Sequence, residues 1–265
     1  MKRNPDALFD EIRHLFFPRR CVLCSKITEN LSRATPLCSA CRQVWQAALL
    51  KPCPECRQIT MRCRCLPAAL QKEKAAGVKL PQTEFYHLMP YESGNLRAPA
   101  VKLLLRLKRQ KDADALDFLA SQMMPLCECA IAEHRVDSAM DKRNADWIIT
   151  YAPRSRKASA KNGFDQSAAL AKRLSHLLGI PCKQCFRHIR GQNTVQKTLN
   201  SAGRLENAGK SYQLYSKIEL NGKRVLLIDD ILTTGATLSA CAGLLLTAGA
   251  AACICVTAAK TVLQP

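Results

Sequence analysis

The sequence lacks any long hydrophobic run and is short of negative charge. No stretch of its 265 residues reaches the ~18 apolar residues that cross a bilayer, and charges interrupt the N-terminus MKRNPDALFDEIRHLFFPRR too often for a secretory leader. We therefore expect a cytoplasmic protein with no transmembrane segment. The 40 Lys and Arg residues against 21 Asp and Glu give a formal net charge of +19, which favours phosphate-rich partners or acidic surfaces.

Two further kinds of chemistry find no support in the sequence. The five histidines show no metal-ligand spacing, and no pair of nucleophile and general base is evident. The 15 cysteines are an odd number, and several stand in CxxC pairs in a chain without a leader. This usage indicates reduced thiols rather than a disulfide framework.

Eight of the cysteines fall between residues 21 and 65, in knuckles of the CxxC or CxC type. Two knuckles can supply the four thiolates of a tetrahedral zinc site, so we predict one or two structural zinc ions, which would also explain how this polar segment folds. An interleaved pairing, in which the first and third knuckles share one ion, is left open. The predicted ligand sets are Cys21, Cys24, Cys38 and Cys41, and Cys53, Cys56, Cys63 and Cys65.

Arginines surround these knuckles, and Trp45 lies among them. Cationic side chains with an aromatic ring on which a base can stack suit single-stranded nucleic acid. The alternative is a module that only supports the fold. Cys182 and Cys185 form another CxxC without a partner pair, and we interpret them as core thiols.

Hydrophobic periodicity predicts helices at 96–108 and 112–134, the second bent or interrupted at Pro125. From Trp147 onward short apolar strands alternate with helices, which predicts an α/β domain with a parallel sheet and a ligand at the carboxyl ends of its strands. The expected organisation is an N-terminal helix at 1–18, the cysteine module at 19–66, a linker at 67–83 and the α/β domain at 84–265. The first helix could pack beside the cysteine module or lie on a membrane surface.

The segment Val225 to Thr237, VLLIDDILTTGAT, orders an apolar strand, two aspartates, a hydroxyl-rich glycine turn and a helix. Backbone N–H groups at a helix start and threonine hydroxyls bind a phosphate, while ionised carboxylates accept hydrogen bonds from sugar hydroxyls or bind a divalent cation. A lone acidic pair would only cap a turn, but this uninterrupted order predicts a ribose 5-phosphate site. Its residues are Asp229 and Asp230 for the sugar, and Thr233, Thr234, Gly235, Ala236 and Thr237 for the phosphate.

The same segment resembles the thirteen-residue phosphoribosyl pyrophosphate (PRPP) signature of type I phosphoribosyltransferases. GFDQSAALA at 163–171, with the register of Gln196, Leu199, Arg204, Asn207 and Tyr212, is similar to the competence protein F (ComF/GntX) family. In that family a double zinc ribbon precedes a phosphoribosyltransferase-like domain. The resemblance implies a parallel-sheet domain of that fold, in which Asp229 and Asp230 are the catalytic residues and Mg²⁺ accompanies PRPP.

Two segments depart from the family pattern or are weakly patterned. Tyr151 to Arg154 replaces a VPVP-like turn, and the arginine that precedes Gly163 in the family is absent. That turn contacts pyrophosphate in this fold, so Arg154 and Lys157 are candidate contacts. The polar, basic loop 187–210 could close over pyrophosphate or could simply be solvated. Its candidate contacts are Arg190, Gln196 and Arg204.

The resemblance implies a cytosolic factor of natural competence that assists uptake or processing of transforming single-stranded DNA. Its implied partners are PRPP or a nucleotide, single-stranded DNA, and DNA-uptake or helicase proteins. The alternative is an active phosphoribosyltransferase that transfers phosphoribosyl from PRPP to an acceptor that the sequence does not specify. A third interpretation is a fold retained as an interaction scaffold.

Overall fold

The computed structural model describes residues 19–27, 36–110, 112–134, 146–153, 164–189, 211–216 and 218–262. The N-terminal helix expected at 1–18 lies outside these ranges. So do five candidate ligand contacts, Arg154, Lys157, Arg190, Gln196 and Arg204.

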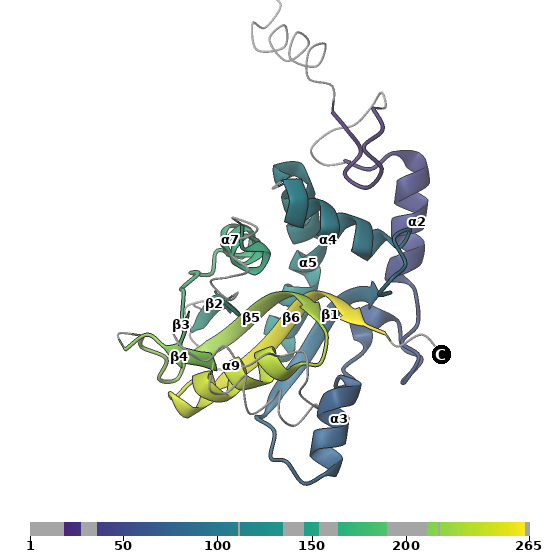
Figure 1. Ribbon diagram of the computed structural model, residues 1–265. Coiled ribbons are helices and arrows are strands. Elements are labelled where there is room, and N and C mark those ends of the chain that lie inside the picture. The colour runs from purple at the N-terminus through teal and green to yellow at the C-terminus, as the bar shows by residue number, and fades with distance from the viewer. Residues whose placement is uncertain are drawn as a thin grey trace, which may run out of the picture.

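The central element is a sheet of four parallel strands in the order β1-β6-β5-β2 (Figure 1). The prediction of a parallel α/β sheet is confirmed. The strands are β1 (Thr83–Tyr91), β2 (Trp147–Tyr151), β5 (Arg224–Leu232) and β6 (Ala252–Thr261). The aspartate pair lies within β5, because this strand continues four residues beyond Ile228, where the sequence suggested its end.

Helices cover both faces of this sheet (Figure 1). One face packs against α5 (Ala113–Glu133) and α7 (Gln166–Leu178), and the other against α9 (Ala236–Thr247). The ends of α7 follow its sequence, since Asp165 accepts a hydrogen bond from the backbone N–H of Ala168 and Gly179 ends the helix at φ 65°. A short antiparallel pair, β3 (Phe186–His188) with β4 (Tyr212–Leu214), lies beside β2 and α9.

A bend or an interruption was expected at Pro125, and helix α5 is not interrupted there, since one helix contains this residue. Ten of its residues are buried, including Met123, Leu126 and Cys127 around the proline. Packing of these neighbours offsets the lost backbone hydrogen bond. By length and composition this helix could cross a membrane, but 56% of its apolar window is buried inside the protein, as in a core helix.

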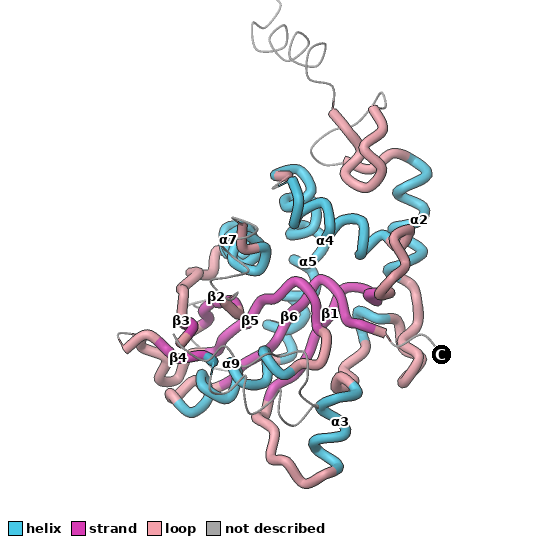
Figure 2. The backbone as a smooth tube through the Cα atoms, viewed as in Figure 1, coloured by secondary structure: helices cyan, strands magenta, loops and turns pink. Residues whose placement is uncertain are grey.

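The cysteine module carries its own helices and joins the main core. It contains α2 (Ser39–Leu49) and the 3₁₀ turn Thr60–Arg62, with mostly loop on either side of α2 (Figure 2). Helix α3 (Ala68–Ala75) follows in the segment expected as a linker. Trp45 of α2 is 2% exposed, and its indole Nε1 donates to Oε1 of Gln122 at 2.9 Å. Trp45 is therefore a core residue, which corrects the expectation that it stacks on a base.

Helix α4 (Pro99–Gln110) connects the module to the sheet. Its apolar side, which includes Leu103 and Leu107, shares one core cluster with Val22 and Leu37 of the cysteine module. The side that carries Lys102 and Arg109 is exposed.

Candidate functional site: two cysteine clusters and a ligand turn

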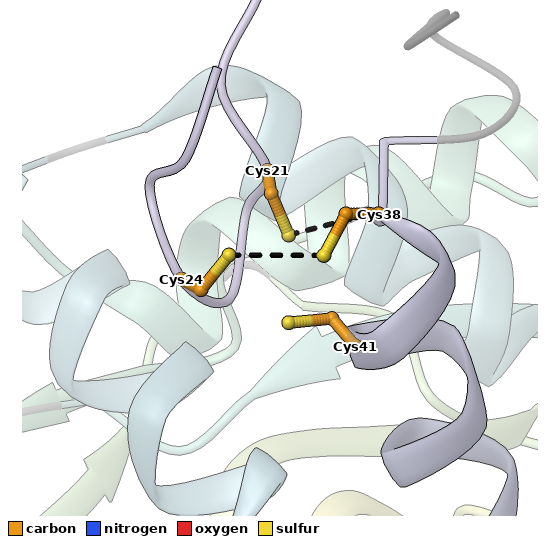
Figure 3. Close-up of side chains that lie close together, drawn as sticks. All are labelled: Cys21, Cys24, Cys38 and Cys41. Atoms are coloured by element: carbon orange, nitrogen blue, oxygen red, sulfur yellow. Dashed lines mark hydrogen bonds between the residues drawn. The ribbon is translucent and has the colours of Figure 1, made fainter. Parts of the chain in front are cut away.

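The first four cysteines converge on one point (Figure 3). Cys21 and Cys24 come from a tight turn, while Cys38 and Cys41 flank the start of α2. All four Sγ atoms lie within 4.8 Å of one another, and those of Cys24 and Cys38 are 3.8 Å apart. Tetrahedral coordination at about 2.3 Å per Zn–S bond places sulfurs about 3.8 Å apart, so this cluster fits a zinc ion.

The electrostatics of this cluster also suit a cation. Burial alone would raise the pKa of Cys21, but backbone amide donors, Cys38 first among them, outweigh burial and lower that pKa to about 7. The amide of Cys38 lies 3.4 Å from the Cys21 Sγ. Burial first, and then the neighbouring thiols, raise the pKa of Cys41. Without a cation the four thiols oppose one another's ionisation, and a divalent metal removes that opposition.

The second cluster, Cys53 with Cys56, Cys63 and Cys65, repeats the backbone pattern of the first. The residue after each CxxC, Ser25 or Arg57, has a left-handed φ of about 60°. Its amide donates to the carbonyl of the first cysteine, at 2.8 Å in the first knuckle and 2.9 Å in the second. Consecutive knuckles thus form two sets, as the spacing predicted, and the interleaved pairing is not formed. Both sets suit structural zinc.

The aspartate pair lies at the carboxyl end of β5, where both side chains are partly buried. The Ser167 hydroxyl, at the start of α7, donates to Oδ1 of Asp229 at 2.7 Å, and the same oxygen accepts the backbone N–H of Asp230 at 2.9 Å. Oδ1 of Asp230 accepts the N–H of Ile231 at 2.8 Å. These bonds fix the orientation of both carboxylates at the ligand edge of the sheet.

Sequence reasoning missed Ser167, although it lies in the quoted stretch GFDQSAALA. The available signal was position, because the first turn of a helix beside a parallel strand lies at the ligand edge of the sheet. The preceding Gln166 has a structural contact, since its side-chain amide donates to the Leu104 carbonyl of α4 at 2.8 Å.

The turn after β5 leads directly into a helix, as the predicted phosphate site requires. Gly235 has φ 79°, and α9 begins at the next residue. Amides in the first turn of a helix have no intrahelical acceptor, so those of Ala236 and Thr237 lie where an anion is favoured. The hydroxyl of Thr234 lies 3.4 Å from the amide of Ala236. The roles of Thr233 to Thr237 stay predictions.

Tyr212 of β4 lies beside this turn. Burial raises its pKa to about 12, with smaller effects from Cys241, Thr237 and Asp229. Its ring is tilted against that of His188, with centroids 4.7 Å apart. The β3–β4 pair thus reaches the ligand end of the sheet.

Helix α3 packs directly on the turn, which the sequence did not reveal. A Cβ atom on Gly235 would lie 2.6 Å from Cδ1 of Leu70 and 3.0 Å from Cγ of Pro67. Nearby, Nζ of Lys260 at the end of β6 donates to the Cys65 carbonyl at 3.1 Å and lies 3.7 Å from Oε2 of Glu55. The second cysteine cluster and the ligand turn are therefore neighbours.

The C-terminal part of the chain is similar to a known domain family. Residues 160–263 match the phosphoribosyl transferase domain family. The chain is 33% identical over 100 residues to the DNA utilization protein YhgH of Salmonella typhi, and equally to that of Salmonella typhimurium. This match covers 36% of the chain and 43% of each relative, so the chain spans less than half the length of these curated relatives.

Solved structures also align with part of the chain. The hypoxanthine phosphoribosyltransferase of Trypanosoma cruzi, as a point mutant complexed with the product IMP, is 15% identical, with 54% of this chain and 62% of that chain covered and a TM-score of 0.35. An allosteric regulatory enzyme of purine biosynthesis is 21% identical, with 54% and 25% covered and a TM-score of 0.33.

Two features from separate parts of the chain therefore combine. The C-terminal part is a phosphoribosyltransferase domain by its matched residues, and it contains the strand, acidic pair and helix start of its signature. Two four-cysteine clusters precede it. Two four-cysteine clusters followed by residues that match the phosphoribosyl transferase domain family fit the architecture of the competence protein F family.

Proposed function

We propose that the protein is a cytoplasmic DNA-utilisation factor of the competence type, whose C-terminal domain binds PRPP or a ribose 5-phosphate together with Mg²⁺. The observation that carries the ligand proposal is the joint position of the oriented Asp229–Asp230 pair and the left-handed turn at Gly235. Carboxylates suit ribose hydroxyls and Mg²⁺, and the start of α9 suits a 5′-phosphate.

The proposed role in handling single-stranded DNA rests on the likeness to a DNA utilization protein and on the net charge of +19. A basic protein binds the phosphate backbone of a polynucleotide by releasing its counterions. Under this proposal DNA-uptake or helicase proteins are the expected protein partners.

A second candidate function is catalytic transfer of phosphoribosyl to an acceptor. The retained acidic pair favours it, because displacement of pyrophosphate at the ribose requires positioning and electrostatic stabilisation rather than a protein base. Asp229 and Asp230 would hold the ribose and its cation during that reaction. Release of pyrophosphate from PRPP in the presence of candidate acceptors is the assay that separates binding from turnover.

Calorimetry with PRPP and Mg²⁺ tests the ligand site. Ser167→Ala removes a buried donor to Asp229, so affinity should fall about 5- to 30-fold, as expected for about 1–2 kcal/mol. Ser175→Ala is the matched control, because that hydroxyl lies at the other end of α7 and donates to the Ile180 carbonyl. Asp229→Asn with Asp230→Asn should abolish binding. Equal affinity in all four proteins would refute the site.

The biological role is tested by complementation in the source organism. A deletion strain should lose natural transformation while ordinary growth persists, and the double Asp variant should fail to restore transformation. Full transformation in the deletion strain would exclude a competence role.

A further inference from the structure

An open pocket of about 450 Å³ lies between the first cysteine knuckle and α4. Its apolar lining comes from Leu23 of the knuckle, Leu96 before α4, and Leu105 of the helix. Leu96 is 68% exposed, although it is a large hydrophobic residue. The cationic lining is Lys102, Arg106 and Arg109 of α4.

The three cations form a stripe along one side of α4. They stand at positions i, i+4 and i+7, with Leu105 between them, so they share a helical face about 10 Å long. Arg106 is anchored: it donates to the Cys21 carbonyl at 3.0 Å and to the Ser25 hydroxyl at 2.9 Å, and it pairs with Asp112. Lys102 and Arg109 are exposed and form no ion pair with any described residue.

The surroundings of the pocket strengthen its positive potential. The described segments 19–27, 36–50 and 94–109 contain three, one and five basic residues and no acidic residue. Asp112, which lies just beyond them, is paired with Arg106. These described segments around the pocket therefore carry only positive formal charge.

We propose that this pocket, lined by Leu23, Leu96, Leu105, Lys102, Arg106 and Arg109, binds the phosphodiester backbone of a single-stranded polynucleotide. This inference rests on the proposed role in handling DNA and assigns a site to it. A stripe of three cations about 10 Å long can contact neighbouring phosphates of one strand. The exposed Leu96 and the partly exposed Leu105 offer apolar contact to unstacked bases, which a duplex does not present.

The chemistry favours a polynucleotide over other anions. A lipid surface is broad and flat, whereas these cations line a pocket between two elements. A peptide made only of acidic residues carries no planar apolar group for Leu96 and Leu105. Binding of an anionic vesicle or of an acidic peptide is therefore an outcome that the experiment must distinguish.

The test uses the full chain with zinc and a fluorescent 20-mer of single-stranded DNA at several salt concentrations. Lys102→Gln with Arg109→Gln should reduce the slope of log affinity against log salt by about 1.4, from ~0.7 per phosphate contact. Affinity at 50 mM salt should fall about 10- to 100-fold. Lys172→Gln with Lys183→Gln removes two exposed lysines from elsewhere on the chain and should leave both quantities unchanged.

The outcomes separate this inference from the proposed function. Equal slopes in the two double variants, with DNA bound by the native protein, would overturn the pocket and leave the DNA role standing. Absence of DNA binding by the native protein would overturn both. An RNA 20-mer of the same sequence shows whether the sugar matters.

Vesicles with phosphatidylglycerol and a poly-glutamate peptide complete the comparison. If the Lys102 and Arg109 substitutions weaken either of these and not DNA, the polynucleotide assignment is wrong. Zinc content and circular dichroism of both variants confirm that the substitutions leave the fold intact, and PRPP calorimetry should give the native affinity for both.

Discussion

Both the backbone conformation and the packing at position 235 favour glycine. Its φ of 79° penalises any residue with a Cβ, and that Cβ would lie 2.6 Å from Leu70. Gly235→Ala should therefore lower the free energy of unfolding by about 2–4 kcal/mol, the sum of left-handed strain and overpacking. Urea denaturation measures this change.

Gly179→Ala is the control for that substitution, because Gly179 is also left-handed, at φ 65°, but a Cβ there meets nothing within 4 Å. It should cost only about 1–2 kcal/mol, the strain alone. An equal loss of unfolding free energy in both variants would show that the Leu70 side chain does not oppose a Cβ at position 235.

His87 introduces a pH dependence. It lies on β1 opposite Thr257, which in turn lies opposite Asp229. Its ring is fully buried, and neither ring nitrogen has a hydrogen-bond partner among the described residues. Burial first, then the charges of Lys260 and Arg64, lower its pKa from 6.5 to about 3.

The folded state holds His87 neutral, whereas the unfolded state binds a proton at this residue below pH 6.5. The free energy of unfolding is therefore unaffected by His87 above pH 6.5 and decreases as the pH falls from 6.5 toward 3. Between pH 7 and pH 5 the free energy of unfolding should fall by about 2 kcal/mol through this group. His87→Leu should remove that part of the pH dependence, while His176→Leu at an exposed position should keep it. Cysteine protonation affects both variants alike, so an equal pH dependence in the two would contradict this role.

At the residue scale, the sequence predicts groups whose chemistry is carried by local spacing. The eight clustered cysteines and the order of Asp229, Asp230 and Gly235 are of this kind. Ser167 and Leu70 are distant in the chain from the residues that they contact, and a serine or leucine has no type-specific signal. Trp45 shows the converse error, since an aromatic residue among arginines indicates stacking until its burial is known.

Helix α3 couples the cysteine module to the ligand turn. Leu70 is 2% exposed, and Leu70→Ala should cost about 2–5 kcal/mol of unfolding free energy, as buried leucines do. The same truncation makes room for a Cβ on Gly235. In a double-mutant cycle, the loss of unfolding free energy in the Leu70→Ala, Gly235→Ala double variant should be smaller than the sum of the two single losses, by at least about 1 kcal/mol.

Leu116→Ala in α5 supplies the reference for that cycle, because Leu116 is buried in the other core cluster. It should be additive with Gly235→Ala. Additivity in both pairs would show that α3 and the turn are energetically independent.

Elements with strong periodicity are predictable, and elements whose stability comes from packing are not. The strand beginning at Trp147 and the helix α7 with its caps follow their sequence patterns. Helix α5 passes through Pro125 because buried neighbours outweigh a local preference. Helix α2 was not predicted, because the cysteine segment has little hydrophobic periodicity. Its position is fixed by the Cys38 and Cys41 side chains at its start and by the burial of Trp45.

The whole molecule should depend on the metal. Cys21 and Val22 share a core cluster with α4 and α5, so removal of a cation from the first site should loosen the packing around Trp45. In a Trp147→Phe variant Trp45 is the one tryptophan left, and a chelator should shift its fluorescence emission to longer wavelength and lower the Tm.

The shift of Trp45 emission should disappear when zinc is restored. A Trp45→Phe variant, in which Trp147 of β2 is the reporter, should show a smaller change. Full loss of metal with Trp45 emission unchanged would show that the first cluster does not support the core.

The sheet has a consequence for any attempt to divide the protein. The residues matched by the phosphoribosyl transferase family begin at 160, yet β1 and β2, which flank β6 and β5, precede that position. A fragment that starts at residue 160 would keep β5 paired to β6 but leave the outer edge of each strand without its partner. Unpaired backbone N–H and C=O groups on buried, apolar strands recruit other chains, so such a fragment would aggregate. The smallest soluble unit of this ligand site should begin before Thr83, with strands that the family match leaves out.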